Sequence, residues 1–202
     1  MLIEQPPQFL RLIWKGVWRK KKPNKKVVYL TFDDGPSPIT TPKLLDVLDE
    51  YGVKAVFFCV GENVQKYPDL FADIKQRGHQ VGNHTMHHLK GFCTNNDTYI
   101  QDVATANKLI HSHLMRPPYG RIKPKQLRKL SKEYEIIMWD VITRDYNEKL
   151  TPEKVFSIVK KYTRNGSIIV FHDSEKSAKN MFGALPLSIE FLKKNRYEFE
   201  LL

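Results

Sequence analysis

Short apolar runs alternate with helix-like stretches along this chain. The runs that predict strands cover seven segments: 27–32, 55–60, 79–82, 114–116, 135–139, 167–171 and 197–202. The first of them is continuous in β-branched and aromatic residues, which is typical of a strand buried on both faces. Strands that alternate with helices predict a parallel sheet with right-handed crossovers. We therefore expect an α/β fold built as a distorted, incompletely closed (β/α)7-type barrel.

The intervening stretches carry helix signals. Proline marks the first turn of two helices, at Pro42 and Pro152, and Gly52 ends the first of them. Asn96 or Asp97 can cap a longer helix that reaches about residue 113. The predicted helices cover residues 42–52, 69–77, 96–113, 126–132, a segment that starts at 152, and 185–194.

Length and composition indicate one catalytic domain with a flanking segment. The chain has 202 residues, 41% of them hydrophobic, which is enough for one well-buried core. We expect the domain to span residues 27–202, with the basic and aromatic segment 1–26 packing on or beside it. The net charge of +11 suits an anionic partner such as a cell-wall polymer, an acidic glycan or a lipid headgroup. No helix-turn-helix, zinc-finger or aromatic RNA-binding pattern occurs, so nucleic acid is not an expected partner.

The N-terminal segment allows two interpretations. Its apolar residues recur at helical spacing and are followed by lysines, so it could be a lid across the barrel end or a helix on an anionic membrane surface. In a secretory signal the charges precede the apolar core, and here that order is reversed. With no long apolar span either, we expect a cytoplasmic protein with a peripheral membrane contact as the alternative. Of the two cysteines, Cys59 is expected to be a buried strand thiol.

The candidate catalytic residues lie just after predicted strands. In α/β barrels the carboxyl ends of the strands meet at one face, so these residues are expected to share a pocket. His84 and His88 have the spacing that lets two imidazoles bind one divalent ion, and an oxygen ligand would complete an open catalytic site. Adjacent Asp33 and Asp34 point to opposite sides, so one carboxylate can face the metal and the other the attacking water. The remaining candidates are Arg116, Asp145 and His172.

Together these residues resemble the NodB-type polysaccharide deacetylases, also called carbohydrate esterase family four. Thr31-Phe32-Asp33-Asp34-Gly35 is similar to the first motif of that family, and His84-Thr85-Met86-His87-His88 to the second. Arg116-Pro117-Pro118-Tyr119-Gly120 resembles the third motif, and Val170-Phe171-His172 the last. The likeness runs from about Val27 to Leu202, with the motifs in family order.

The resemblance implies a role for each matched residue. Asp34, His84 and His88 would hold a divalent metal, usually zinc, with Asp33 as general base. Arg116 would orient Asp33, and the backbone N–H of Tyr119 would bind the developing oxyanion. His172 would be the general acid, oriented by Asp145. The activity implied is removal of N-acetyl groups from a sugar or a peptidoglycan- or chitin-like glycan.

The fourth motif departs from the family pattern. Family members commonly show Asp-x-x-Asp-Trp, where this chain has Ile142 and Tyr146 in place of the first acid and the tryptophan. These changes concern the substrate groove more than the chemistry. Two alternatives stay open: an amide hydrolase for a small or lipid-linked sugar, which the basic charge and the expected cytoplasmic location favour, and a non-catalytic glycan-binding protein.

Overall fold

The computed structural model describes residues 4–5, 16–18, 20, 22 and 24–202. A curved parallel sheet forms its centre, with strand order β5-β4-β3-β2-β1-β7-β6 and β8 paired to β1 alone. The strands are β1 (Val27–Asp33), β2 (Val56–Cys59), β3 (Gln80–Asn83), β4 (Leu114–Met115), β5 (Glu135–Ile136), β6 (Val141–Ile142), β7 (Ser167–His172) and β8 (Glu198–Phe199).

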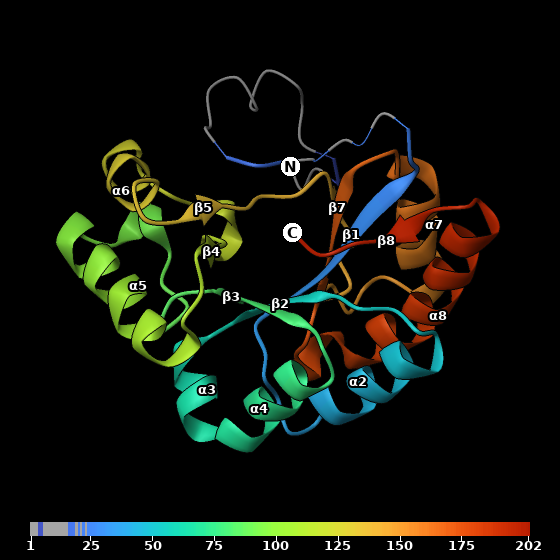
Figure 1. Ribbon diagram of the computed structural model, residues 1–202, viewed down its shortest axis with the longest axis horizontal. Coiled ribbons are helices and arrows are strands. Elements are labelled where there is room, and N and C mark those ends of the chain that lie inside the picture. Colours follow the sequence, from blue (N-terminus) through green and yellow to red (C-terminus); the bar gives the residue numbers. More distant parts are fainter. Residues whose placement is uncertain (1–3, 6–15, 19, 21, 23) are drawn as a thin grey trace.

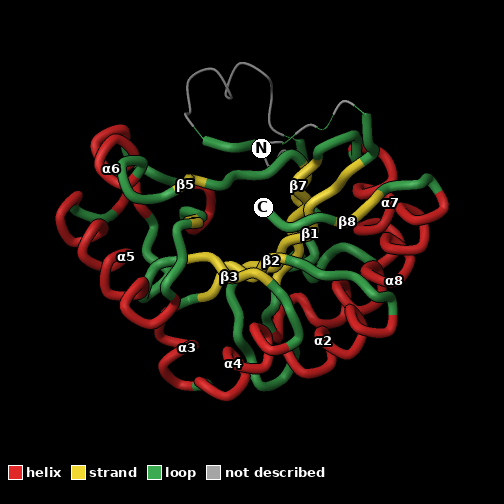
Figure 2. The backbone as a smooth tube through the Cα atoms, viewed as in Figure 1, coloured by secondary structure: helices red, strands yellow, loops and turns green. Residues whose placement is uncertain are grey.

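Helices line the outside of this curve, from α6 and α5 through α3, α4 and α2 to α8 and α7 (Figures 1 and 2). They are α2 (Thr41–Glu50), α3 (Gly61–Lys66), α4 (Pro68–Gln76), α5 (Asn96–Ile110), α6 (Pro124–Leu130), α7 (Pro152–Tyr162) and α8 (Ala178–Lys194). Three short 3-10 helices connect them: η1 (Gly91–Cys93), η2 (Pro118–Gly120) and η3 (Glu175–Ser177). The predicted α/β class and the incompletely closed barrel are confirmed.

The alternation of side chains along β1 divides the core into an inner and an outer layer. Val27 and Tyr29 pack inside the barrel with residues of β2, whereas Val28 and Leu30 pack outside against the helices. Full burial of each such side chain contributes about 1.5–3 kcal/mol. Asp33 continues the inward series at the carboxyl end of the strand, so the register that builds the core also places this carboxylate in the barrel mouth.

The barrel is open between its end strands, β5 and β6, which are not paired with each other among the described residues. Described residues of the N-terminal segment lie along this opening. Val17 forms a parallel bridge with Ile137: its N–H donates to the Ile136 carbonyl in β5 and its carbonyl accepts from the Met138 N–H, each at 2.8 Å. The Glu4 carbonyl accepts from Ile142 N–H in β6 at 2.9 Å. These contacts satisfy backbone groups that the missing strand pairing would leave exposed.

The apolar stretch on which the lid and membrane interpretations rest falls mainly on residues 6–15, which lie outside the described residues. Within the described part, Val17 has a bridge conformation rather than a helical one. None of the helices in the described part of the chain is both long and apolar enough to cross a membrane.

The membership of the sheet differs from the prediction. The apolar run 135–139 contains only the two-residue β5, and a separate strand, β6, pairs with β7 in the register Val141↔Ile169. The final predicted strand shortens to β8, which pairs with the start of β1. The prediction also missed α3, whose six residues are too few to show a helical period. Cys59 is a buried free thiol in β2, as predicted.

Two helix boundaries also differ. Asn95, not Asn96 or Asp97, caps α5 through an Asp97 N–H···Oδ1 bond, and the helix ends at Ile110 because His111 is left-handed. The helix predicted from residue 185 begins at Ala178 and contains Pro186. Proline argues against a helix interior because it lacks an N–H donor. Burial of Met181 and Ala184 in the outer core outweighs that local preference.

Candidate active site

Asp33 and Arg116 form a buried ion pair at the mouth of the barrel. Arg116 follows β4, is fully buried, and donates from Nη1 to Asp33 Oδ1 at 2.5 Å. The guanidinium also donates to Thr31 Oγ1 at 2.8 Å and to the Met138 carbonyl at 3.1 Å. It stacks on the Phe58 ring, with its carbon 4.0 Å from the ring centroid. Burial lowers the pKa of Arg116, while the Asp33 charge opposes that shift. The arginine thereby fixes one carboxylate oxygen of Asp33 in place.

Asp34, His84 and His88 form a set of ligands that fits a metal ion. Their ligand atoms all lie within 4.8 Å of one another, and Asp34 Oδ1 is 3.6 Å from His84 Nε2 and 3.2 Å from His88 Nε2. Burial would raise the pKa of Asp34, but the hydrogen bond from His88 and the charges of His172 and His84 hold it well below its usual range. The carboxylate is therefore ionised, as a metal ligand must be.

His84 has the tautomer and charge that a ligand needs. Its Nδ1 lies 2.8 Å from the Arg116 carbonyl oxygen, which can only accept, so Nδ1 carries the proton and Nε2 keeps its lone pair. Burial lowers the pKa of His84 to about 4, which keeps the ring neutral near pH 7. Hydrogen bonding of this kind orients ligand histidines at metal sites.

The loop that carries both histidines is held from behind by α5. Thr85 and His88 have positive φ angles of 66° and 52°, a conformation that costs energy for residues other than glycine. Asp102 of α5 accepts the backbone N–H groups of Met86 and His87 at 2.8 and 3.1 Å. His87 points its own side chain at Asp102 and does not join the ligand set.

His172 and Asp145 form a second charged pair. His172 ends β7, and its Nδ1 lies 2.8 Å from Oδ1 of Asp145, whose Oδ2 accepts the His172 backbone N–H at 2.8 Å. Burial favours the neutral ring, but the Asp145 charge and hydrogen bond raise the pKa of His172 to about 9. The imidazole is therefore protonated at neutral pH. The Tyr146 ring packs edge-on against it, with ring centroids 4.8 Å apart.

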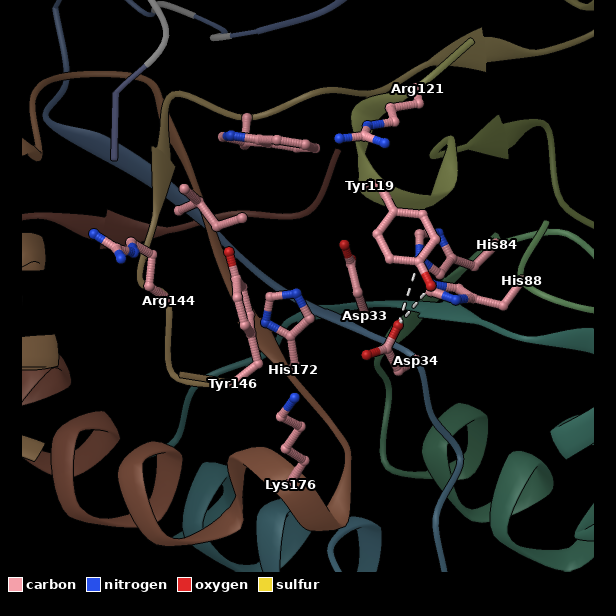
Figure 3. A pocket seen from close by; sticks show the side chains of 12 residues that line it. Asp33, Asp34, His84, His88, Tyr119, Arg121, Arg144, Tyr146, His172 and Lys176 are labelled. Atoms are coloured by element: carbon pink, nitrogen blue, oxygen red, sulfur yellow. Dashed lines mark ion pairs between the residues drawn. The ribbon is translucent and has the colours of Figure 1, made fainter. Parts of the chain in front are cut away.

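One cavity of about 480 Å³ connects these groups. Figure 3 shows Asp33 between His172 on one side and the ligand set of Asp34, His84 and His88 on the other. Arg116 and Asp145 stand behind the wall of the cavity. The lining residues are Asp33, Asp34, His84, His88, Tyr119, Arg121, Trp139, Ile142, Arg144, Tyr146, His172 and Lys176.

Tyr119 lies on the metal-ligand side of the cavity, with its ring 4.7 Å from that of His88. The turn at this point is left-handed at both Tyr119 (φ 60°) and Gly120 (φ 63°). A side chain on Gly120 would overlap the Trp139 ring, so close packing requires glycine here. The turn brings Tyr119, which sequence reasoning assigned to the oxyanion, to the cavity edge.

The fold brings all eight sequence-predicted site residues to this cavity or directly behind it. Sequence reasoning missed Asp102, whose only signal was a single acid among apolar positions of its helix. It also missed Arg121 and Lys176, because isolated cations in a basic chain carry no pattern. Asp140, an acid two residues before Ile142, does not line the cavity and pairs with Arg164 at 2.7 Å.

Comparison with known proteins places this geometry in a family. Residues 20–139 match the model of the polysaccharide deacetylase family. A peptidoglycan-N-acetylglucosamine deacetylase of Bacillus cereus is 33% identical over 185 residues, which cover 87% of this chain and 86% of that protein. The peptidoglycan-N-acetylmuramic acid deacetylase PdaC of Bacillus subtilis is 35% identical over 159 residues, which cover 75% of this chain and 33% of PdaC.

Solved structures of carbohydrate esterases of this kind have a similar fold. The Bc1960 peptidoglycan N-acetylglucosamine deacetylase superposes with a TM-score of 0.83 at 32% identity, covering 89% of this chain and 88% of that one. A family 4 carbohydrate esterase from Streptomyces lividans gives 0.80 at 26% identity, with coverage of 87% and 92%. The wild-type Bacillus anthracis pseudoenzyme BA3943 gives 0.81 at 25% identity, with coverage of 92% and 66%.

The chain belongs to the polysaccharide deacetylase family. It is a polysaccharide deacetylase-like hydrolase with a NodB homology domain, and its matched relatives include peptidoglycan deacetylases.

Proposed function

We propose that this protein hydrolyses N-acetyl groups on sugar units of a peptidoglycan-like glycan, releasing acetate and leaving a free amine. The observation that carries the proposal is the position of Asp33 between a potential metal site and a protonated histidine in one cavity. A base, a site for a Lewis acid and an acid are the three groups that metal-assisted amide hydrolysis uses. The names of the matched relatives support the glycan as substrate.

Asp34, His84 and His88 would hold a divalent metal, with zinc as the usual ion for two imidazoles and one carboxylate at an open site. Their fit rests on the ionised Asp34 and on the free Nε2 of neutral His84. When bound, such an ion lowers the pKa of a coordinated water and polarises the acetamide carbonyl.

Asp33 is assigned the general base. One of its oxygens is held by Arg116, and the carboxylate lines the cavity beside the ligand set, where it can take a proton from the attacking water. The backbone N–H of Tyr119 is assigned to donate a hydrogen bond to the oxyanion that develops on the acetamide oxygen.

His172 is assigned the general acid. An amide releases nitrogen only when that nitrogen takes up a proton, and His172 carries one at neutral pH because Asp145 stabilises the imidazolium. Since Nδ1 faces Asp145, Nε2 is the atom that would protonate the departing amine.

The experiment described below also distinguishes two other functions. One is hydrolysis of a small or lipid-linked sugar, and the other is a non-catalytic glycan-binding role. One structural relative is a pseudoenzyme, so the fold alone does not establish catalysis. Here the paired groups Asp33–Arg116 and Asp145–His172 are both complete, which favours an enzyme.

The deciding experiment measures acetate released from peptidoglycan glycan strands, N-acetylated oligomers and monomeric sugars. Zinc-loaded protein is compared with chelator-treated protein and with protein reloaded after chelation. We expect the protein to release acetate from glycans, the chelator to abolish that release, and added zinc to restore it. Release from monomers alone would favour the small-substrate alternative, and glycan binding without release would favour the non-catalytic one.

A further inference from the structure

The rim of the cavity is rich in positive charge. Among its lining residues the only acids are Asp33 and Asp34, and Asp33 is paired with Arg116 while Asp34 faces the two histidines. Arg144 lies on the rim but donates to Glu4 at 2.6 Å. Within the described residues, Arg121 and Lys176 have no ion pair with a carboxylate. Two exposed cations therefore line the cavity with charges that no described carboxylate neutralises.

These two cations stand at opposite ends of the cavity. In Figure 3 Arg121 lies at the top beside Tyr119, Lys176 lies at the bottom beneath His172, and Asp33 and His172 lie between them. A bound saccharide whose acetamide is at Asp33 would extend toward both. The cations are therefore placed to contact the sugar units next to the reacting unit rather than the acetamide itself.

Each cation is attached to a loop that also carries a site residue. Arg121 lies two residues after Tyr119, and its N–H donates to the Pro118 carbonyl at 3.1 Å. Lys176 belongs to η3, where its neighbour Ser177 is buried and donates from Oγ to the His172 carbonyl at 2.7 Å. These hydrogen bonds hold the backbone of each loop beside the site, while Arg121 and Lys176 themselves are exposed and line the cavity.

A neutral glycan would gain little from two such charges. Unpaired cations around a cavity create a positive potential that attracts anions and raises their local concentration. Protonated His172 adds to that potential, as would a divalent ion on Asp34, His84 and His88. Arginine and lysine form charge-assisted hydrogen bonds with carboxylates and with phosphates, and of these two the carboxylate is the group that the sugar units of the proposed glycan can carry.

Building on the proposed function, we infer that Arg121 and Lys176 bind carboxylates on the sugar units flanking the one that is deacetylated. The preferred substrate is then an acidic N-acetylated glycan rather than a neutral one. In a polymer in which acidic units alternate with the reacting unit, both neighbours carry a carboxylate, which matches one cation at each end.

The test compares one glycan in two charge states. Peptide-free glycan strands with free lactyl carboxylates are assayed beside the same strands after methyl esterification, which removes the charge and keeps the length. The measured quantity is the ratio of kcat/KM on the acid to kcat/KM on the ester. For the unmodified protein we expect a ratio clearly above one that falls with added salt, because exposed charges are screened.

The variants are Arg121→Gln, Lys176→Gln and the double variant. Exposed ion pairs contribute modestly, so each single substitution should lower the acid-to-ester ratio by roughly two- to fivefold, mainly through KM. Lys160→Gln is the matched control, since Lys160 is an exposed cation at the end of α7 and does not line the cavity. That control should keep the ratio of the unmodified protein.

The outcomes separate this inference from the proposed function. A ratio near one, or a ratio that the double variant leaves unchanged, would overturn the assignment of Arg121 and Lys176 while deacetylation itself still stood. Acetate release from neither strand would overturn both together. A ratio that drops in the variants and persists in Lys160→Gln establishes the acidic glycan as the preferred class.

Discussion

The side chain of His87 and the carboxylate of Asp102 form a clamp behind the two candidate metal ligands His84 and His88. His87 Nδ1 lies 2.5 Å from Oδ1 of Asp102, and Oδ2 of the same carboxylate accepts the backbone N–H groups of Met86 and His87. Asp102 is buried on α5, whereas His87 is 57% exposed. The carboxylate of Asp102, 15 residues after His87, thus ties a loop with two left-handed residues to α5.

Asp102→Ala is expected to weaken zinc binding by about 10- to 100-fold, the usual cost of losing a group that orients metal ligands. Without the carboxylate, two backbone N–H groups lose their acceptor and the strained loop can relax. Competition with a chromophoric chelator measures the affinity. Asp97→Ala, an exposed acid in the first turn of the same helix, is the control; equal affinities in the two variants would remove the positioning role.

Asp33→Asn is expected to abolish acetate release while zinc stays bound. The amide keeps the shape of the side chain but cannot accept the proton of the attacking water. Metal content by atomic emission, together with an acetate assay, separates the two effects. Retained turnover would mean that Asp33 is not the base, and loss of zinc would move it into the ligand set.

Arg116→Met is expected to destabilise the fold by about 3–5 kcal/mol, the typical cost of leaving one member of a buried ion pair alone. Asp33 would remain in the barrel mouth without its partner, and the donors to Thr31 and the Met138 carbonyl would be lost. Chemical denaturation measures the free energy of unfolding. The double variant Arg116→Met with Asp33→Asn should recover part of the loss, and no recovery would argue against the pair as the cause.

On the alkaline side of the pH–rate profile, the loss of activity should follow the deprotonation of His172. Its pKa is raised to about 9, so the acid form is present at neutral pH and is lost as pH rises through that value. We expect kcat/KM to fall there. Asp145→Asn removes the charge that raises the pKa but leaves the burial that lowers it, so the fall should move to lower pH. Glu148→Gln, on the same loop and exposed, should leave the profile in place. An unmoved profile in Asp145→Asn would mean that another group is titrating.

Val17→Asp should lower the free energy of unfolding by about 2 kcal/mol, because Val17 packs against the inner core where it bridges Ile137. Val17→Ile is the conservative control. We propose on this ground that segment 1–26 helps to close the barrel. Unchanged stability in Val17→Asp with loss of binding to anionic vesicles would instead favour the membrane interpretation.

Much of the site was predictable because its signals are local. The continuous apolar run of β1, the two aspartates that follow it and the His84–His88 spacing can each be read within a few residues. The alternation of strand-like and helix-like segments then predicts the parallel barrel. Asp33, Arg116 and His172 lie at the carboxyl ends of its strands. The predicted start of α8 was wrong because packing overrode the local preference of Pro186. The strand β6 and the helix α3 were missed because each is too short to show a periodic pattern.

The sequence by itself determined the class of fold, the order of the motifs and the residue types available for chemistry, since backbone preference and side-chain alternation act over short separations. The family resemblance implied that Arg116 orients Asp33, but only the tertiary structure showed their contact across 83 residues, and it alone revealed that Asp102 clamps the His84–His88 loop. It alone placed Arg121 and Lys176 at opposite ends of the cavity. Such pairings depend on how twisted strands and helices pack in three dimensions, and a single sequence contains no periodic pattern that records them.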